Sequence, residues 1–305
     1  MKKFGLALGG GGARGLAHIG VLKVLEQNKI KIHSVTGCSM GAIIGGLYAY
    51  YGNSRQVENF ILEIINHPKF IELGIEKLSE NNNKLDKNYF EQFYDYIGKR
   101  VQALKALNRL SYFDEQLTNE MYKVIPDVAI ENFKIKFSAI ATDLLSGEEI
   151  NFTNGSLRKV IQASSAIPGI FPPVKYQNYF LIDGSASESV PAAKVRDLGA
   201  DRVLAVDVTR EIKIIEEPQN VFEILYRAED ISSYHLSMVR LREANLVISP
   251  NVKYLSWADF DKAELIISAG EKAAQDNLEN ILKLYNRNAS ILKIEHKLKK
   301  IIGEI

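Results

Sequence analysis

Two glycine-containing turns near the start of the chain carry residue types that suit acyl transfer. The first is a run of glycines within residues 9–15, directly after the apolar segment Phe4–Leu8, and the second is Gly-Cys-Ser-Met-Gly at residues 37–41. Backbone N–H groups that converge in a glycine turn can stabilise an oxyanion, and a serine at a sharp strand-to-helix turn is presented as a nucleophile. Together the two turns predict a serine hydrolase.

The glycine turn contains Gly10-x-Gly12-x-x-Gly15, which is also the fingerprint of a dinucleotide-binding turn. That fingerprint needs an acidic residue at the end of the second strand to bind the ribose, and residues 32–37 contain none. Nucleotide binding is therefore disfavoured, and the turn suits a phosphate or the oxyanion of a tetrahedral intermediate. Arg14, inside the turn, either anchors a substrate phosphate or pairs with a structural carboxylate.

The second turn presents a candidate nucleophile, Ser39. Gly37 and Gly41 flank it at the spacing of a nucleophile elbow, where glycines relieve the crowding of the turn. Cys38 is a competing nucleophile, but such a turn presents its central residue. We therefore assign the nucleophile to Ser39 and a packing role to Cys38.

A serine nucleophile needs a base, and the usual α/β-hydrolase triad places a histidine late in the chain. Two of the five histidines precede the serine turn, and the other three lie in helical patterns without a glycine-rich loop. A catalytic histidine is therefore not expected, although His235 stays an alternative.

A carboxylate must then serve as the base. Asp183 ends the apolar segment 179–182 and precedes Gly184, at a strand-end turn of the kind where sites are built. Asp143 and Asp207 also end strand-like segments, so the pattern favours Asp183 only slightly. Each of the three aspartates has an alternative role as a turn or helix-cap residue.

The composition argues against several kinds of site and partner. The 305 residues include 38 Lys and Arg against 37 Asp and Glu, so no basic stripe indicates a nucleic acid. Cys38 is the one cysteine, which excludes an intrachain disulfide and a cysteine-rich metal cluster and fits a reducing, cytoplasmic compartment. No run approaches the roughly 20 apolar residues of a bilayer span. We expect a soluble protein, at most peripheral at the inner membrane surface, without a metal or an organic cofactor.

Alternating strand and helix patterns predict an α/β fold with a parallel sheet flanked by helices. The predicted strands are 4–8, 32–36, 136–143, 149–153, 176–182, 202–208 and 246–249. The predicted helices are 16–27, one from about residue 42, one near 157–165, and most of the chain after 208. We expect a catalytic domain over residues 1–210 and a mostly helical extension, 211–305, packed on the same domain.

Residues 57–128 show helical periodicity, and the three asparagines 81–83 predict a loop within them. Their apolar stripe is Phe90, Phe93, Tyr94, Ile97, Val101, Leu104 and Leu107. Such a stripe is typical of a core-facing helix. The alternative is that residues 66–130 form a lid over an apolar substrate channel.

The C-terminal segment combines an apolar stripe with lysines. The stripe is Leu284, Ile291, Ile294, Leu298, Ile301 and Ile305, and the lysines are Lys293, Lys297, Lys299 and Lys300. A basic amphipathic helix can lie on anionic lipid and so give peripheral membrane contact. The same spacing is typical of a helix that forms a homo-oligomer or packs on the protein body. We prefer this interpretation to membrane contact.

Four sequence blocks, in this order, resemble the patatin-like phospholipase family, especially its compact bacterial single-domain members. They are Gly-Gly-Gly-Ala-Arg-Gly at 10–15, the serine turn at 37–41, Ala-Ser-Ser-Ala-Ile-Pro at 163–168, and Asp183-Gly184. The similarity is strong from residue 4 to about 208 and looser to about 274. It implies a three-layer α/β/α patatin-like fold with a mainly parallel central sheet, here with a helical C-terminal extension.

The resemblance also implies roles for the site residues. Ser39 would be the nucleophile and Asp183 its base in a Ser-Asp dyad. The N–H groups of Gly10, Gly11 and Gly12 would form the oxyanion hole. The other motif residues are Arg14, Gly15, Gly37, Gly41 and Gly184.

The chain departs from the family pattern at one position of the aspartate block. The family usually has Gly or Ala after Asp-Gly, whereas this chain has Ser185. Serine is small enough for the turn, and its hydroxyl is expected to hydrogen-bond Asp183 and lower its basicity.

The expected function is hydrolysis of fatty-acyl esters in phospholipids, lysophospholipids or related lipids through an acyl-enzyme. A lipid transacylase or thioesterase using the same site is an alternative. Ser185 motivates a third hypothesis, a catalytically idle lipid-binding regulator.

Overall fold

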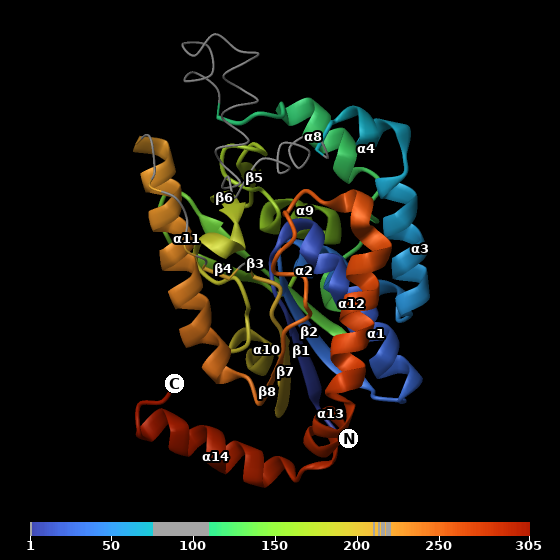
Figure 1. The fold of residues 1–305 in the computed structure, drawn as a ribbon, viewed down its shortest axis with the longest axis vertical. Coiled ribbons are helices and arrows are strands. Elements are labelled where there is room, and N and C mark those ends of the chain that lie inside the picture. The colour runs from blue at the N-terminus through green and yellow to red at the C-terminus, as the bar shows by residue number, and fades with distance from the viewer. Residues whose placement is uncertain (1, 76–109, 210, 213, 215–216, 218–220) are drawn as a thin grey trace.

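The computed structural model describes residues 2–75, 110–209, 211–212, 214, 217 and 221–305 (Figure 1). Within these residues, eight strands form one sheet in the order β5-β6-β3-β2-β1-β7-β8, and β4 also pairs with β3. The strands are β1 (Phe4–Leu8), β2 (Ile32–Cys38), β3 (Lys136–Asp143), β4 (Glu149–Phe152), β5 (Val174–Tyr176), β6 (Tyr179–Asp183), β7 (Arg202–Val206) and β8 (Leu246–Ile248).

Helices follow most of these strands. The α-helices are α1 (Ala17–Gln27), α2 (Met40–Tyr51), α3 (Ser54–Ile65), α4 (Pro68–Glu72), α8 (Glu115–Tyr122), α9 (Leu157–Ser164), α10 (Lys194–Asp197), α11 (Val221–Arg240), α12 (Ala263–Asp276), α13 (Leu278–Asn286) and α14 (Ala289–Ile301). The short 3-10 helices are η1 (Gly12–Leu16), η3 (Ile130–Asn132), η4 (Gly184–Ala186), η5 (Leu241–Glu243) and η6 (Phe260–Lys262).

The centre of the sheet is buried on both faces. On β1, Leu6 and Leu8 belong to a large apolar core that also contains residues of α1, α2 and α12. Ala7, between them, belongs to a second core with Val195 of α10 and Leu241 of η5. Side chains of a strand alternate between the two faces, so helices on both sides bury every residue of β1. The sheet is therefore the middle of three layers.

Parallel pairing dominates the middle of the sheet. The pairs β1/β2, β1/β7, β2/β3 and β7/β8 are parallel, while β3/β4, β3/β6 and β5/β6 are antiparallel. The expected α/β fold with a mainly parallel central sheet is confirmed, with an antiparallel side that the sequence pattern did not indicate.

One predicted strand was wrong. Residues 176–182 were expected to form one strand, but the chain turns back within them and forms the β5/β6 hairpin. Gln177, in the turn, has φ 52°, a left-handed conformation that glutamine rarely adopts. The turn lacks the Asn-Gly or Asp-Gly pair that usually signals a tight hairpin. The aromatic residues on both sides of it therefore predicted one continuous strand.

The helical region 57–128 is described in part. Its described helices are α3, α4 and α8, whereas the apolar stripe from Phe90 to Leu107 and the asparagines 81–83 lie outside the described residues. The helix expected at 16–27 begins as the 3-10 helix η1 and continues as α1.

The C-terminal region adds to the sheet and to one core. Strand β8 pairs with β7. Helix α12 crosses α1 so closely that a Cβ built on Gly270 would lie 1.9 Å from the Ala17 carbonyl oxygen, which is why a glycine is needed there. The division between residues 210 and 211 stays a prediction. Among the helices that the structure describes, none has the length and apolar character to cross a membrane.

Candidate active site

Strand β3 brings the ends of two distant strands together. β2 pairs in parallel with the first part of β3, up to Cys38 opposite Ile140. β6 pairs antiparallel with the next part, where Asp183 lies opposite Ala141. Because β4 occupies the other edge of β3, β2 and β6 meet end to end along the same edge. Ser39 directly follows Cys38, so the fold sets it beside Asp183.

Ser39 lies in a sharp turn between β2 and α2. Its φ of 52° and ψ of −122° are unusual for serine, and such a strained conformation is characteristic of a nucleophile elbow. The carbonyl of Ser39 accepts the N–H groups of Ala42 and Ile43, which starts the helix. The conformation therefore fits the elbow predicted from the sequence.

Glycines permit the close packing of this turn. A Cβ on Gly37 would lie 2.3 Å from the Gly41 carbonyl oxygen, and one on Gly41 would lie 2.1 Å from the Leu8 carbonyl oxygen. No side chain fits at either position, so both glycines are needed to bring the serine turn against the end of β1.

The glycine turn lies against the nucleophile candidate. A Cβ on Gly10 would lie 3.2 Å from Ser39 Cβ and 2.7 Å from Ser185 Oγ. The Gly10 N–H donates to the Ser189 carbonyl oxygen at 2.9 Å. Neither Gly11 nor Gly12 donates its N–H to an acceptor within the described ranges. These two N–H groups are therefore the available donors for an oxyanion, while the Gly10 N–H is already used.

Two buried side chains hold the glycine turn in place. Arg14 donates to the Val208 carbonyl at 3.0 Å from Nε and to the Leu255 carbonyl at 3.0 Å from Nη1. His18 donates from Nε2 to the Gly9 carbonyl at 2.8 Å. Burial lowers the pKa of His18 to about 4, so this ring is neutral at physiological pH. The contacts of Arg14 favour a structural role, with backbone carbonyls as the partners in place of the expected carboxylate.

Asp183 is buried beside Ser39, with a 3% exposed surface. Its Oδ1 accepts the Ser185 N–H at 2.8 Å and lies 3.7 Å from the Cys38 thiol. Burial raises the pKa of this carboxyl, while hydrogen bonds from the Ser39 and Ser185 hydroxyls act in the opposite direction. Oδ2 has no partner at standard hydrogen-bond geometry in the described part of the chain. Asp183 therefore combines a raised basicity with an oxygen able to accept a proton.

The alternative aspartates have structural partners. Asp143 accepts hydrogen bonds from the Ser146 hydroxyl at 2.7 Å and the Phe180 N–H at 2.8 Å, and these bonds lower its pKa. Asp207 forms an ion pair with Lys253 at 3.2 Å. Both carboxylates stabilise turns beside the sheet, in line with their alternative role.

The competing groups at the serine turn and on α11 are poorly suited to catalysis. Burial, with the charge of Asp183, raises the pKa of the Cys38 thiol well above its usual range, which disfavours the thiolate. His235 is exposed on α11, whereas Ser39 is buried in the turn after β2.

Ser164 is a site residue to which the sequence assigned no role. Its hydroxyl accepts the Ser39 N–H at 3.0 Å and donates to the Ile140 carbonyl at 2.5 Å. It therefore fills the break between β2 and β6 and holds the serine turn. The signal available was its place in the Ala-Ser-Ser-Ala-Ile-Pro block at 163–168.

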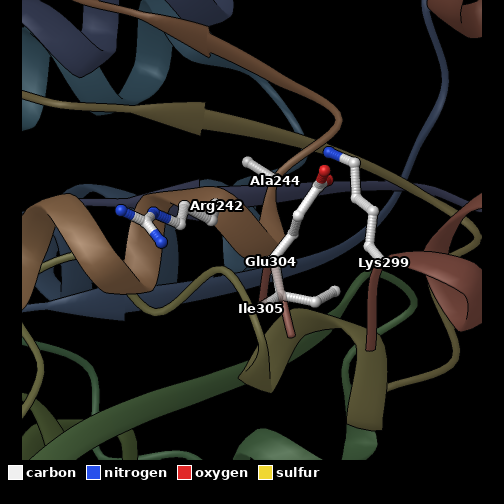
Figure 2. A pocket seen from close by; sticks show the side chains of 5 residues that line it. All are labelled: Arg242, Ala244, Lys299, Glu304 and Ile305. Carbon is white, nitrogen blue, oxygen red and sulfur yellow. The ribbon is translucent and has the colours of Figure 1, made fainter. Parts of the chain in front are cut away.

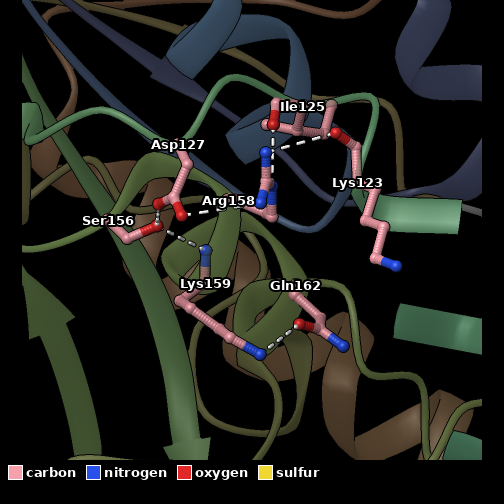
Figure 3. Close-up of polar contacts among 7 residues, drawn as sticks. All are labelled: Lys123, Ile125, Asp127, Ser156, Arg158, Lys159 and Gln162. Carbon is pink, nitrogen blue, oxygen red and sulfur yellow. Dashed lines mark hydrogen bonds and ion pairs between the residues drawn. The ribbon is translucent and has the colours of Figure 1, made fainter. Parts of the chain in front are cut away.

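The helix that carries Ser164 is itself held at its start (Figure 3). The Ser156 side chain caps α9 by accepting the Lys159 N–H at 3.3 Å. Arg158 reaches from α9 to the segment after α8 and donates to the carbonyls of Ile125 at 2.8 Å and Lys123 at 3.2 Å. These contacts join the start of α9 to the segment that follows α8.

Tyr122, at the end of α8, is a second residue that the sequence did not single out. Burial and the charge of Asp183 raise the pKa of its hydroxyl, and the Ser165 hydroxyl acts in the opposite direction. Tyr122 therefore lies near the candidate base. The proposal of a lid over residues 66–130 stays a prediction.

The described residues contain no group of three His, Cys, Asp or Glu side chains placed to hold a metal ion. A hollow between η5 and the end of α14 is lined by Arg242, Ala244, Lys299, Glu304 and Ile305 (Figure 2). None of these five residues belongs to the site around Ser39.

Comparison with known proteins decides the family. Residues 6–195 match the family described as patatin-like phospholipase. The chain belongs to this family. The matched range contains both catalytic candidates of this patatin-like phospholipase chain, and the resemblance inferred from its four sequence blocks is confirmed.

The curated relatives of this patatin-like phospholipase chain are longer proteins. An NTE family protein of Mycobacterium bovis is 30% identical over 67% of the chain and 48% of its own length. The lysophospholipase nte1 of Neurospora crassa is 24% identical over 92% of the chain and 18% of its own length. Neuropathy target esterase sws of Drosophila melanogaster is 30% identical over 68% of the chain and 13% of its own length. The chain thus spans about half the length of the first relative and a small part of the others.

A solved structure is also similar. VipD from Legionella pneumophila aligns with 92% of this chain and 67% of its own, with 14% sequence identity and a TM-score of 0.48.

Proposed function

We propose that the chain is a serine hydrolase of fatty-acyl esters in phospholipids, lysophospholipids or related lipids. The observation that carries the proposal is the end-to-end meeting of β2 and β6 on β3, which sets the strained Ser39 beside the buried Asp183. The names of its relatives, lysophospholipase and esterase, support the substrate class.

In the proposed reaction, Asp183 takes the hydroxyl proton as Ser39 Oγ attacks the ester carbonyl carbon. The carbonyl oxygen becomes an oxyanion, which accepts hydrogen bonds from the Gly11 and Gly12 N–H groups. Asp183 then gives its proton to the departing alcohol, and an acyl-enzyme is left on Ser39. Water then attacks this ester, and Asp183 takes a proton from it. Asp183 gives that proton to Ser39 Oγ as the fatty acid leaves.

The Gly10 N–H has a different place in this proposal. It donates to the Ser189 carbonyl in the described structure, so it becomes a third oxyanion donor only if that hydrogen bond opens. While this hydrogen bond is present, it holds the glycine turn against the loop that follows Asp183.

Substitution of the two candidate bases tests the function. Asp183→Asn should lower turnover of a p-nitrophenyl ester and of a lysophospholipid by about 10²–10⁴-fold, because the base is lost. Asp143→Asn is the matched control and should keep most of the turnover. Equal losses in both variants, measured on folded protein, would contradict the assignment. Product analysis with and without an alcohol acceptor separates the hydrolase from a transacylase.

We infer in addition that the outward face of α14 contacts an anionic lipid surface. Leu292 is buried against the protein body, whereas Ile291, Ile294, Leu298 and Ile301 are 50–70% exposed. Lys293, Lys297 and Lys300 are exposed at three- and four-residue spacing beside this apolar stripe. An apolar stripe next to a lysine row is complementary to lipid with negative headgroups.

The position of α14 limits what this contact can do. Lys2, just before β1, hydrogen-bonds Asn286 at 2.5 Å, and Arg202 at the start of β7 hydrogen-bonds the Arg287 carbonyl. Helix α14 therefore lies at the amino-terminal edge of the parallel strands, whereas Ser39 follows the carboxyl end of β2 (Figure 1). The contact would tether the protein and would not deliver lipid directly to Ser39.

A further inference from the structure

Glu188 is a buried carboxyl group that the proposed reaction does not use. Its exposed fraction is 0%, and neither carboxyl oxygen has a partner at standard hydrogen-bond geometry among the residues that the structure describes. Burial of a carboxylate without a well-aligned hydrogen bond is costly, and such a group is normally neutral or functional.

Charged groups from several elements face Glu188. Glu149 of β4 is a like charge that acts on Glu188, and it forms ion pairs with Lys194 of α10 at 2.7 Å and Arg240 of α11 at 3.9 Å. The thiol of Cys38 lies close enough for the charge of Glu188 to raise its pKa. Glu188 thus shares its surroundings with a carboxylate whose two cationic partners are already engaged.

These surroundings favour the protonated form of Glu188. Burial and then the charge of Glu149 raise the pKa of Glu188 to about 8, although Arg240 and Lys194 act in the opposite direction. A neutral carboxyl beside Glu149 avoids both the desolvation of a charge and the repulsion between two carboxylates.

The loop that carries Glu188 joins the candidate base to the glycine turn. Asp183 begins the loop, and the Glu188 N–H donates to the Gly184 carbonyl at 2.8 Å. The next residue, Ser189, accepts the Gly10 N–H at 2.9 Å. A displacement of Glu188 would therefore act on both parts of the site.

We propose that Glu188 is a positioning residue whose protonated side chain, buried beside Glu149, keeps the loop 184–189 closed against the glycine turn. Loss of its proton draws the carboxylate toward water, which displaces the Ser189 carbonyl and with it Gly10. This inference rests on the proposed function of Ser39 and Asp183 and adds an upper pH limit to it.

The protonated state of Glu188 also affects the stability of the folded protein, independently of activity. The unfolded chain releases the Glu188 proton at the ordinary glutamate pKa, whereas the folded protein keeps it to about pH 8. The stability from this group is complete below the ordinary pKa and is lost as the pH rises through that of the folded state. Glu188→Gln removes this dependence because glutamine does not titrate.

The test is the pH dependence of ester turnover in three variants. Glu188→Gln should move the alkaline fall in kcat to higher pH, because glutamine has no carboxyl proton to lose. Glu149→Gln should move it to lower pH, because removal of the neighbouring charge lowers the pKa of Glu188. Glu279→Gln, an exposed glutamate on α13, is the matched control and should leave the alkaline fall in place.

An alkaline fall that stays at the same pH in both Glu188→Gln and Glu149→Gln would overturn the inference. Urea unfolding of wild type and Glu149→Gln across the same pH range supplies a second readout. The pH at which the free energy of unfolding falls must be lower in Glu149→Gln than in the wild type, and this comparison holds even if Glu188→Gln does not fold. Absence of Ser39-dependent turnover at every pH would instead be a failure of the proposed function, so the two failures are distinguishable.

Discussion

The hydroxyl of Ser164 accepts the backbone N–H of Ser39 at 3.0 Å. The same hydroxyl donates to the Ile140 carbonyl of β3 at 2.5 Å. Ser164, at the end of α9, therefore joins the strained serine turn to the strand on which β2 and β6 meet.

Ser164→Ala should destabilise the protein and lower catalysis together. The substitution leaves the Ser39 N–H and the Ile140 carbonyl without their buried partner, at a cost of about 1–3 kcal/mol. The free energy of unfolding and kcat at a temperature where the variant is folded measure the two effects. Ser156→Ala, which removes the cap of the same helix at a cost of about 1 kcal/mol, should lower stability and leave kcat intact. If both variants keep kcat, Ser164 does not position Ser39.

The sequence predicted the local parts of the site well. The segment Phe4–Leu8, the turn at Ser39 and the strand Lys136–Asp143 were predicted from neighbouring residues, and the structure has them at the same places. Local chemistry decides these features, because glycines and alternating apolar residues act over a few positions.

The long-range parts could not be predicted in this way. The meeting of Cys38 and Asp183 on adjacent residues of β3 depends on strand register across the sheet, which no local pattern records. The same holds for the hydrogen bond that occupies the Gly10 N–H and for the buried environment of Glu188. Asp183 stood out from the other aspartates in the sequence mainly through the family resemblance.

Ser185→Ala should move the acid limb of the pH profile for kcat/KM to higher pH. The Ser185 hydroxyl lowers the pKa of Asp183, so its removal raises that pKa, and the base is protonated at a higher pH. Ser146→Ala is the matched control, because its hydroxyl donates to Asp143 at 2.7 Å and not to Asp183. A limb that moves to lower pH in Ser185→Ala would contradict this role.

Gly10→Ala should lower turnover by at least about tenfold. Its added Cβ would lie 2.7 Å from Ser185 Oγ and would push the glycine turn away from Ser39. Gly147→Ala is a useful comparison, because a Cβ there meets nothing within 4 Å but φ is 76°. That variant should lose about 1 kcal/mol of stability and keep its turnover. Similar turnover in the two variants would argue against close packing of Gly10 on the site.

Replacement of Lys293, Lys297 and Lys300 by glutamine should weaken binding to vesicles that contain anionic lipid by at least about tenfold. Each lysine near such a surface contributes about 1 kcal/mol. Co-sedimentation with anionic and with neutral vesicles measures the effect, and Lys272→Gln on α12 is the control. Unchanged binding of the triple variant would exclude α14 as the lipid contact. Analytical ultracentrifugation of the wild type tests the alternative that this face joins two copies of the chain.

Covalent labelling by a fluorophosphonate probe, followed by mass spectrometry of the labelled peptide, tests the Ser39–Asp183 dyad directly. We expect one modified residue, Ser39, in the wild type, with no labelling of Ser39→Ala and much slower labelling of Asp183→Asn. Circular dichroism should show that both variants keep the fold. Labelling that persists in folded Ser39→Ala, or that proceeds at the wild-type rate in Asp183→Asn, would contradict the proposed Ser-Asp dyad.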